Sequence, residues 1–209
     1  FYSDTDNKFK TVVASAAWHS TGSLTNGRAS LSAAGTVPAG MVFGGAGVSN
    51  KTEEYNGSGF FAGGNMNTAR QALGGAGTQT AGLGFGGYST THLALTEEYD
   101  GSSWSESGDL ATARQYVAGA GTQTAGLAFA GRAAPAKTNS TEEYNGTSWT
   151  AGGNMNTARA YLAGCGIQTS ALAFGGSSTG TTGITEAYDG TSWTEVGDLN
   201  TARVSLAGA

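Results

Sequence analysis

The stretch that decides the fold is TEEYNGTSWTAGGNMNTAR, at residues 141–159, because close copies of it recur along the chain. Copies at residues 52–70, 96–114 and 185–203 end in the same Thr-Ala-Arg. A weaker copy, KTVVASAAWHSTGSLTNGR, occupies residues 10–28. The final arginines are therefore spaced by 42 to 45 residues. A fixed period in this range is typical of propellers and other repeat architectures.

Each repeat predicts four short strands separated by turns. A small-residue segment such as ALGGAG (residues 72–77) follows the arginine, and then comes a strand with Leu83 and Phe85 on one face. This alternation is typical of a half-buried strand. The TEEY segment and the tryptophan-bearing segment are joined by Asn-Gly or Asp-Gly, which predicts a hairpin with a type I′ turn. Four antiparallel strands in each repeat predict a propeller blade.

The chain ends predict how the ring is completed. The first strand of each repeat is almost all Gly, Ala and Ser, which favours few blades because little room is left near the axis. Residues 201–209 form a lone first strand, and residues 1–27, with Trp18, provide strands to follow it. We therefore predict an all-β fold, a single five-bladed β-propeller of four-stranded antiparallel blades, in which the pairing of the termini removes an exposed sheet edge. The blades would span residues 28–69, 70–113, 114–158 and 159–202, with the fifth formed by 1–27 and 201–209.

The composition limits the functional classes. The net charge is −5, and an acidic surface repels phosphate backbones, so we expect no nucleic-acid partner. No apolar run reaches the length of a membrane span, and no signal peptide is visible at Phe1. The start without methionine suits a processed or excised piece of a longer protein. The single cysteine, Cys165, excludes an internal disulfide framework and stands where other repeats have alanine, so we expect it to be a small buried residue.

Two resemblances add to this interpretation. The glycine pair after the second strand and the Tyr and Trp five residues apart, as in Tyr144 and Trp149, resemble a kelch-type propeller blade. The Gly/Ala/Thr-rich repeats, for example TARQYVAGAGTQTAGLAFAG, are similar to those of tail or fibre proteins of tailed bacteriophages, marine cyanophages above all. The first resemblance implies a propeller, and the second implies a virion component.

The arginines that end the repeats admit two interpretations. They are Arg28, Arg70, Arg114, Arg159 and Arg203. A ring of arginines can bind an anionic ligand. The interpretation that we favour is architectural, because one glutamate of each TEEY strand must point into a blade interface, where a carboxylate needs a partner. The adjacent glutamates point to opposite faces of the strand and so cannot act as a catalytic pair.

The connections between the second and third strands are the candidate binding loops. They cover residues 46–51, 88–95, 132–140 and 177–184, and they differ in length and composition. Variable loops on a uniform scaffold are where binding usually resides, although unconstrained, solvated connections would look the same. Strand order places these loops and the arginines at one end of the propeller, here called the variable face. The candidate binding residues there are Lys51, Tyr88, His92, Arg132 and Lys137.

These observations favour a non-enzymatic structural or binding protein of a bacteriophage tail or virion appendage, acting in host attachment or tail assembly. The two histidines, His19 and His92, lie in different repeats, so we expect no metal site, cofactor or catalytic residues. Expected partners are other virion proteins, or a host cell-surface glycan or protein, with homo-oligomerisation in an appendage left open. The alternative is a secreted lectin-like propeller, although the repeated tryptophans and tyrosines suit the blade core better than a sugar platform. An enzyme is the third choice.

Overall fold

The computed structural model describes residues 2–3, 8–9 and 22–208, and all regular secondary structure in these residues is β. The strands form four antiparallel four-stranded sheets and two two-stranded hairpins. The first sheet contains β3 (Ser32–Thr36), β4 (Ala39–Phe43), β5 (Thr52–Tyr55) and β6 (Phe60–Ala62). The second contains β7 (Gly74–Thr78), β8 (Ala81–Phe85), β9 (Thr96–Tyr99) and β10 (Trp104–Ser107).

The third and fourth sheets repeat this order. The third contains β11 (Ala118–Gly121), β12 (Gly126–Phe129), β15 (Thr141–Tyr144) and β16 (Trp149–Ala151). The fourth contains β17 (Ala163–Ile167), β18 (Ser170–Phe174), β19 (Thr185–Tyr188) and β20 (Trp193–Val196). The hairpins are β1 (Tyr2–Ser3) with β2 (Lys8–Phe9), and β13 (Arg132–Ala133) with β14 (Ala136–Lys137).

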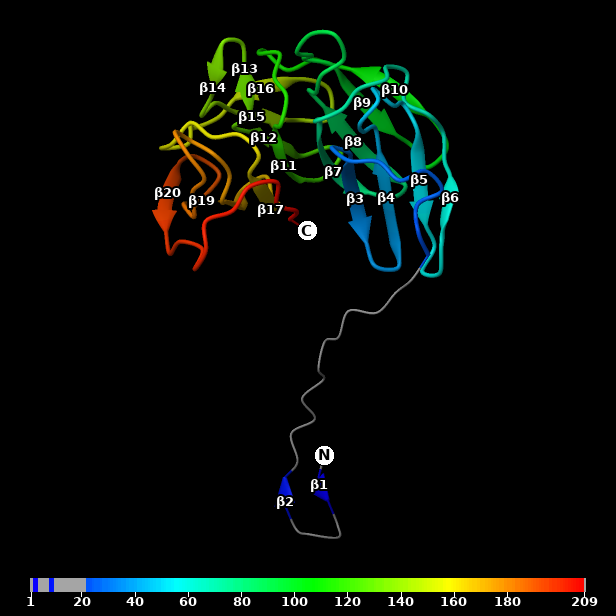
Figure 1. Cartoon of the computed structure of the whole chain (residues 1–209), viewed down its shortest axis with the longest axis horizontal. Coiled ribbons are helices and arrows are strands. Elements are labelled where there is room, and N and C mark those ends of the chain that lie inside the picture. Colours follow the sequence, from blue (N-terminus) through cyan, green and yellow to red (C-terminus); the bar gives the residue numbers. More distant parts are fainter. Residues whose placement is uncertain (1, 4–7, 10–21, 209) are drawn as a thin grey trace.

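The four sheets are arranged as the blades of a propeller. Figure 1 shows them along an arc, with β3–β6 at one end and β17–β20 at the other. The first strand of each blade packs beside the first strand of the next, from β3 through β7 and β11 to β17. The predicted all-β propeller of antiparallel four-stranded blades is therefore confirmed.

The predicted count of five blades is wrong, because the described residues form four. β1 pairs with β2 alone, and residues 204–208 form no strand. Residues 10–21, with Trp18, lie outside the described part of the chain. The C-terminal segment nevertheless occupies the place of a first strand: the Ser205 N–H donates to the Tyr161 carbonyl at 2.9 Å, as the Tyr116 N–H does to the Ala72 carbonyl at 2.7 Å.

Glycines in the first strands make room for phenylalanines of the preceding blade. A Cβ added at Gly164 would lie 2.2 Å from Cζ of Phe129, and one at Gly119 would lie 2.7 Å from Cζ of Phe85. Those rings are fully buried. Small residues in the first strand are thus required by the blade-to-blade contact itself, in addition to the crowding near the axis.

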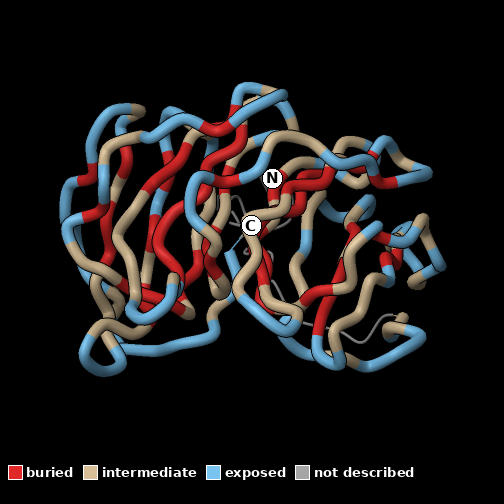
Figure 2. Tube along the Cα trace, turned by 90° about the horizontal axis from the view of Figure 1, so that it is seen from above, coloured by how far each residue is buried: buried red, intermediate tan, exposed pale blue. Residues whose placement is uncertain are grey.

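Aromatic and aliphatic side chains fill the spaces between blades. Figure 2 shows buried residues concentrated along the strands and exposed residues at the connections. Phe85 packs against Trp149 of the next blade with ring centroids 5.0 Å apart, and the indole N–H of Trp149 donates to the Thr96 hydroxyl at 2.9 Å. The Tyr144 hydroxyl also crosses this boundary, donating to Glu98 of the preceding blade. Each boundary is therefore both packed and hydrogen-bonded.

The hairpins between third and fourth strands differ from the predicted type I′ turn. Gly101 has a positive φ of 92°, whereas Asp100 does not have one. The loop spans four residues, since Tyr99 pairs with Trp104. The Asp100 carboxylate accepts N–H bonds from Ser102 and Ser103, both at 2.8 Å, and these bonds lower its pKa to about 2. The acidic or amide side chain therefore stabilises an Asx-type turn and leaves only the glycine in the left-handed region.

Candidate binding site on the variable face

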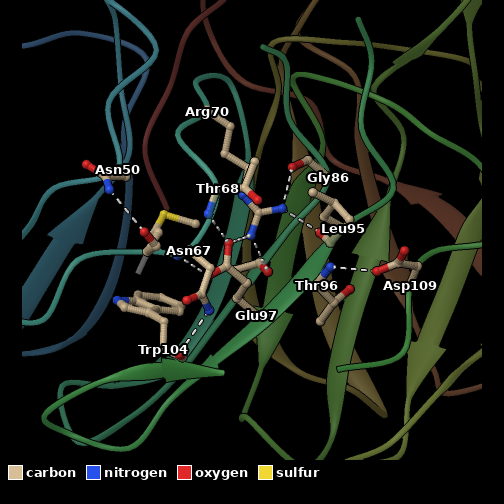
Figure 3. A network of polar contacts seen from close by, with 12 residues as sticks. Asn50, Asn67, Thr68, Arg70, Gly86, Leu95, Thr96, Glu97, Trp104 and Asp109 are labelled. Carbon is tan, nitrogen blue, oxygen red and sulfur yellow. Dashed lines mark hydrogen bonds and ion pairs between the residues drawn. The ribbon is translucent and has the colours of Figure 1, made fainter. Parts of the chain in front are cut away.

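Four of the five repeat-ending arginines form ion pairs with the first glutamate of the TEEY or TEAY strand that follows. The pairs are Arg28 with Glu53, Arg70 with Glu97, Arg114 with Glu142, and Arg159 with Glu186. Figure 3 shows the Arg70 pair, in which Nη2 lies 3.1 Å from Oε1 of Glu97 while Nη1 donates to the carbonyls of Leu95 and Gly86. The same carboxylate accepts the Asn67 N–H at 2.6 Å. Each pair thus ties the connection between two blades to the following blade.

Burial of these arginines removes them from contact with ligands. The side chains of Arg70, Arg114 and Arg159 are 0% exposed. Desolvation lowers the pKa of Arg70 to about 10, and the nearby Glu97 charge opposes that shift. An anion in the surrounding solvent therefore cannot reach these three guanidinium groups. Arg203 is exposed and forms no ion pair with any described residue.

The two connections expected at the variable face are hydrogen-bonded to each other. Gln71 and Tyr88 exchange backbone bonds at 3.0 and 2.8 Å, and Gln115 does the same with Arg132. In the fourth blade Ala160 and Ser177 form the equivalent pair. The loops after the second strands therefore rest on the chain just after the arginines, as strand order predicts.

A groove of about 580 Å³ lies between the loops of the second and third blades. It is lined by Tyr88, Thr90, Thr91, His92, Thr112, Ala113, Ala133 and Ala134. Two of the five predicted binding residues, Tyr88 and His92, are in its wall, and the third, Arg132, is the exposed neighbour of Ala133. The lining presents two rings and several hydroxyls, and none of its residues carries a formal charge with His neutral.

Tyr88 and His92 are held in position by neighbouring groups. Their rings meet edge to face with centroids 5.9 Å apart, and their backbones form a bridge. The side-chain amide nitrogen of Gln115 lies 3.2 Å from Nε2 of His92. Because an amide NH2 can only donate, Nε2 is the acceptor here, and a neutral ring carries its proton on Nδ1. The groove wall is therefore ordered by contacts from two blades.

The other two predicted residues are placed elsewhere. Lys137 crosses from the third-blade loop to the fourth, where its Nζ donates to the Ser177 hydroxyl at 2.9 Å and to the Ser178 carbonyl. Lys137 therefore links the third-blade loop to the fourth-blade loop. Lys51 is exposed in the first blade and is not part of the groove.

Sequence reasoning did not find three features of the site. Thr112, in the connection after β10, lines the groove, and Gln115 orients His92. A pocket of about 530 Å³ on the propeller axis is lined by the first-strand segments and by Tyr116 and Tyr161, whose rings are 4.0 Å apart. Only the tyrosines that interrupt a small-residue strand signal this pocket in the sequence.

The repeated face opposite the variable face is stabilised by glutamines. The side-chain amide of Gln123 donates to the carbonyls of Gly82 at 3.1 Å and Tyr99 at 2.8 Å, both in the preceding blade. Gln79 and Gln168 make the same two bonds at their own boundaries. The turns that carry these glutamines therefore join neighbouring blades by hydrogen bonds.

Two general observations complete the site. Among the residues that the structure describes, no group of three or more His, Cys, Asp and Glu side chains could hold a metal ion. His19 lies outside those residues. The described part of the chain also contains no helix that could cross a membrane.

Comparison with known proteins places the chain in no family: no protein-family model matches it, and no curated protein matches its sequence.

Proposed function

We propose that this propeller is a non-enzymatic binding component of a bacteriophage tail or virion appendage, and that it contacts its partner through the groove between the second- and third-blade loops. The observation that carries the proposal is the contrast between framework and loops. The blades repeat their ion pairs and their tryptophan contacts almost unchanged, while the loops that form the groove differ. Variation restricted to loops on a rigid scaffold is typical of recognition surfaces.

The nature of the groove favours a neutral, hydroxyl-rich ligand such as a host surface glycan. The residues that line the groove include an aromatic ring, that of Tyr88, and three hydroxyl-bearing residues, Thr90, Thr91 and Thr112. Sugars bind through such a mixture of apolar ring contact and hydrogen bonds. This supports attachment to a host surface over tail assembly, and it also supports the alternative, a secreted lectin-like propeller.

The loop of the fourth blade provides a matched test. Residues 88–95 and 177–184 have the same length and corresponding backbone hydrogen bonds. The Leu93 N–H donates to the Gly87 carbonyl at 2.9 Å, and the Thr182 N–H donates to the Gly176 carbonyl at the same distance. Exchanging YSTTHLAL for SSTGTTGI therefore changes the side chains on a backbone that already occurs in this protein. The smaller change Tyr88→Ser with His92→Thr copies the residues at the corresponding positions.

Binding of the full chain to host cells and to a glycan array is measured for wild type and for both variants. We expect both variants to fold as wild type does and to lose binding at least tenfold. A Lys51→Ala variant, altered on the variable face outside the groove, serves as the control and should bind normally. Normal binding by a folded loop exchange would contradict the proposed site. Detection of the protein in purified virions distinguishes the virion component from the secreted lectin.

A further inference from the structure

At each internal blade boundary a tryptophan packs on a phenylalanine of the preceding blade and donates a hydrogen bond to a threonine of that blade. At the boundary between the third and fourth blades, Trp193 packs on Phe129 with ring centroids 4.9 Å apart. Its indole N–H donates to the Thr141 hydroxyl at 2.9 Å. Trp104 and Trp149 make the equivalent contacts at the other two boundaries, with the same 2.9 Å hydrogen bond.

The fourth blade carries the same two groups, Phe174 and Thr185, and Thr185 is 7% exposed against 1% for its equivalents Thr52, Thr96 and Thr141. Leu172 on the same face is 40% exposed, whereas its equivalents Leu83 and Leu127 are 0% exposed. Phe174 is only partly buried, unlike Phe129. Figure 1 shows this blade at one end of the arc. The face is therefore built like an internal boundary, but the described residues cover it less completely.

One polar position on this face has changed, and it restricts what can cover it. At the three internal boundaries a tyrosine hydroxyl donates to a glutamate of the preceding blade, for example Tyr188 to Glu143 at 2.5 Å. The fourth blade has Ala187 at the position of that glutamate. A matching occupant therefore carries a tryptophan but no tyrosine five residues before it, since a buried tyrosine hydroxyl there would lack its acceptor.

The first blade of a second copy does not meet this requirement. Its residues at the two positions are Tyr55 and Phe60. The side chain of Phe60 has no N–H to donate to the Thr185 hydroxyl, and Tyr55 would face Ala187 instead of a glutamate. Stacking of one copy's first blade on another copy's fourth blade would therefore lose both hydrogen bonds that hold the internal boundaries.

The weak repeat copy at residues 10–28 does meet the requirement for a tryptophan without a tyrosine five residues before it. It has Trp18, and the residue five positions earlier is Val13. The described chain just after it already follows the path of an internal connection: a Cβ on Gly22 would lie 2.7 Å from the Ser58 carbonyl oxygen, as one on Gly108 would lie 2.3 Å from that of Thr147. Gly22 therefore lies where the connection that follows the tryptophan strand lies at an internal boundary.

We propose that the partly exposed face of the fourth blade, formed by Leu172, Phe174, Thr185 and Ala187, binds residues 10–18 of the same chain, with Trp18 packed on Phe174 and its indole N–H donating to the Thr185 hydroxyl. Val13 stands where other repeats have the tyrosine, and Ala187 stands where the preceding blade elsewhere has the glutamate. The two changes are then complementary, because donor and acceptor are lost from the same contact. Burial of an exposed apolar face supplies the driving force.

Cys165 provides a native reporter for this contact. It pairs with Leu172 between β17 and β18, so both side chains lie on the same face. Its equivalents Ala76 and Ala120 are buried, whereas Cys165 is only partly buried. The rate at which a maleimide labels the thiol in the full chain measures whether the face is covered.

The test compares wild type with Trp18→Ala, Trp18→Phe and the neighbouring control His19→Ala. We expect labelling to accelerate at least tenfold in Trp18→Ala, with an unchanged far-UV circular dichroism spectrum, and to stay at the wild-type rate in His19→Ala. Trp18→Phe keeps an aromatic ring and tests the hydrogen bond if Trp18→Ala does not fold. In a Thr185→Val background, where the hydrogen bond is already absent, Trp18→Phe should no longer change the labelling rate.

Two outcomes overturn the proposal. Equal labelling rates in wild type, Trp18→Ala and Trp18→Phe would show that residues 10–18 do not cover the face. Protection of Cys165 from labelling that depends on protein concentration, together with a dimer in light scattering, would show that a second copy covers the face. Protection that is independent of concentration in a monomer supports the binding of the chain's own segment.

Discussion

Nη2 of Arg159 lies 2.9 Å from Oε1 of Glu186, and both side chains are completely buried. The pair connects the chain that follows the third blade to β19 of the fourth, and Glu186 also accepts the N–H of Asn156 at 2.7 Å. The buried Glu186 carboxylate keeps its partners only while both the Arg159 guanidinium and the Asn156 N–H contact it.

Arg159→Ala is expected to lower the free energy of unfolding by about 3–5 kcal/mol, because it leaves the Glu186 carboxylate buried without its counter-charge. Urea denaturation followed by tryptophan fluorescence measures the change. Arg203→Ala is the matched control, since Arg203 ends the same motif but is exposed, and its effect should be below about 0.5 kcal/mol. Equal effects of the two substitutions would contradict the role assigned to the buried pair.

Gln123→Ala is expected to destabilise the protein by about 1–3 kcal/mol, because the carbonyls of Gly82 and Tyr99 lose their donor between two blades. The same urea experiment detects it. Thr124→Ala changes an exposed residue of the same turn and should be close to neutral. A Gln123→Ala variant as stable as wild type would show that solvent replaces the amide at no cost.

The tyrosine hydroxyls at the blade boundaries predict a loss of stability in alkali. Burial, followed by the hydrogen bond to Glu143, raises the pKa of Tyr188 to about 12. The folded protein therefore keeps this proton at a pH where the unfolded chain, with an ordinary pKa near 10, has lost it. The stabilisation is complete below pH 10 and is lost as the pH rises towards 12.

Melting temperatures measured from pH 9 to pH 12 test this for wild type and Tyr188→Phe. The wild-type curve should fall more steeply above pH 10 than that of the variant. Titration of the tyrosine absorbance should show fewer groups ionising near pH 12 in the variant. Parallel melting curves would mean that Tyr188 ionises alike in the folded and unfolded states.

Much of the fold could be predicted from the repeat, because the residues that form the contacts between blades recur at fixed positions. Strand alternation predicted that one glutamate of each TEEY strand pairs with a repeat-ending arginine, but it could not tell which glutamate, Glu142 or Glu143, or which blade supplies the arginine. The count of blades could not be predicted in the same way. Residues 201–209 match a first strand in sequence, yet residues 204–208 lack the second strand that elsewhere completes the ladder, as β18 does for β17.

The candidate site was predictable in part for a physical reason. Tyr88 and His92 stand out because they interrupt a uniform pattern, so their place in a loop follows from sequence. That Lys137 bonds to Ser177 depends on the distance between two loops, which the repeat pattern does not encode. The role of Gln123 was missed for the opposite reason: a residue that repeats on a turn resembles a solvated one, and only the position of the neighbouring blade shows its two acceptors.

Gly164→Ala tests the packing of the first strands and should be destabilising by about 1–3 kcal/mol, because the added methyl group would lie 2.2 Å from Cζ of Phe129. The ring cannot withdraw easily, since it is fully buried against Trp193. Gly180→Ala is the matched control: beyond its own chain neighbours, no heavy atom lies within 4 Å of the methyl group that it adds. In the double variant Gly164→Ala with Phe129→Leu, a smaller side chain replaces the ring that the methyl group would meet. The loss of stability should then be smaller than the sum of the losses in the two single variants. Strictly additive effects would show that the alanine is accommodated by movement of the strand, and that the phenylalanine does not determine the need for glycine at this position.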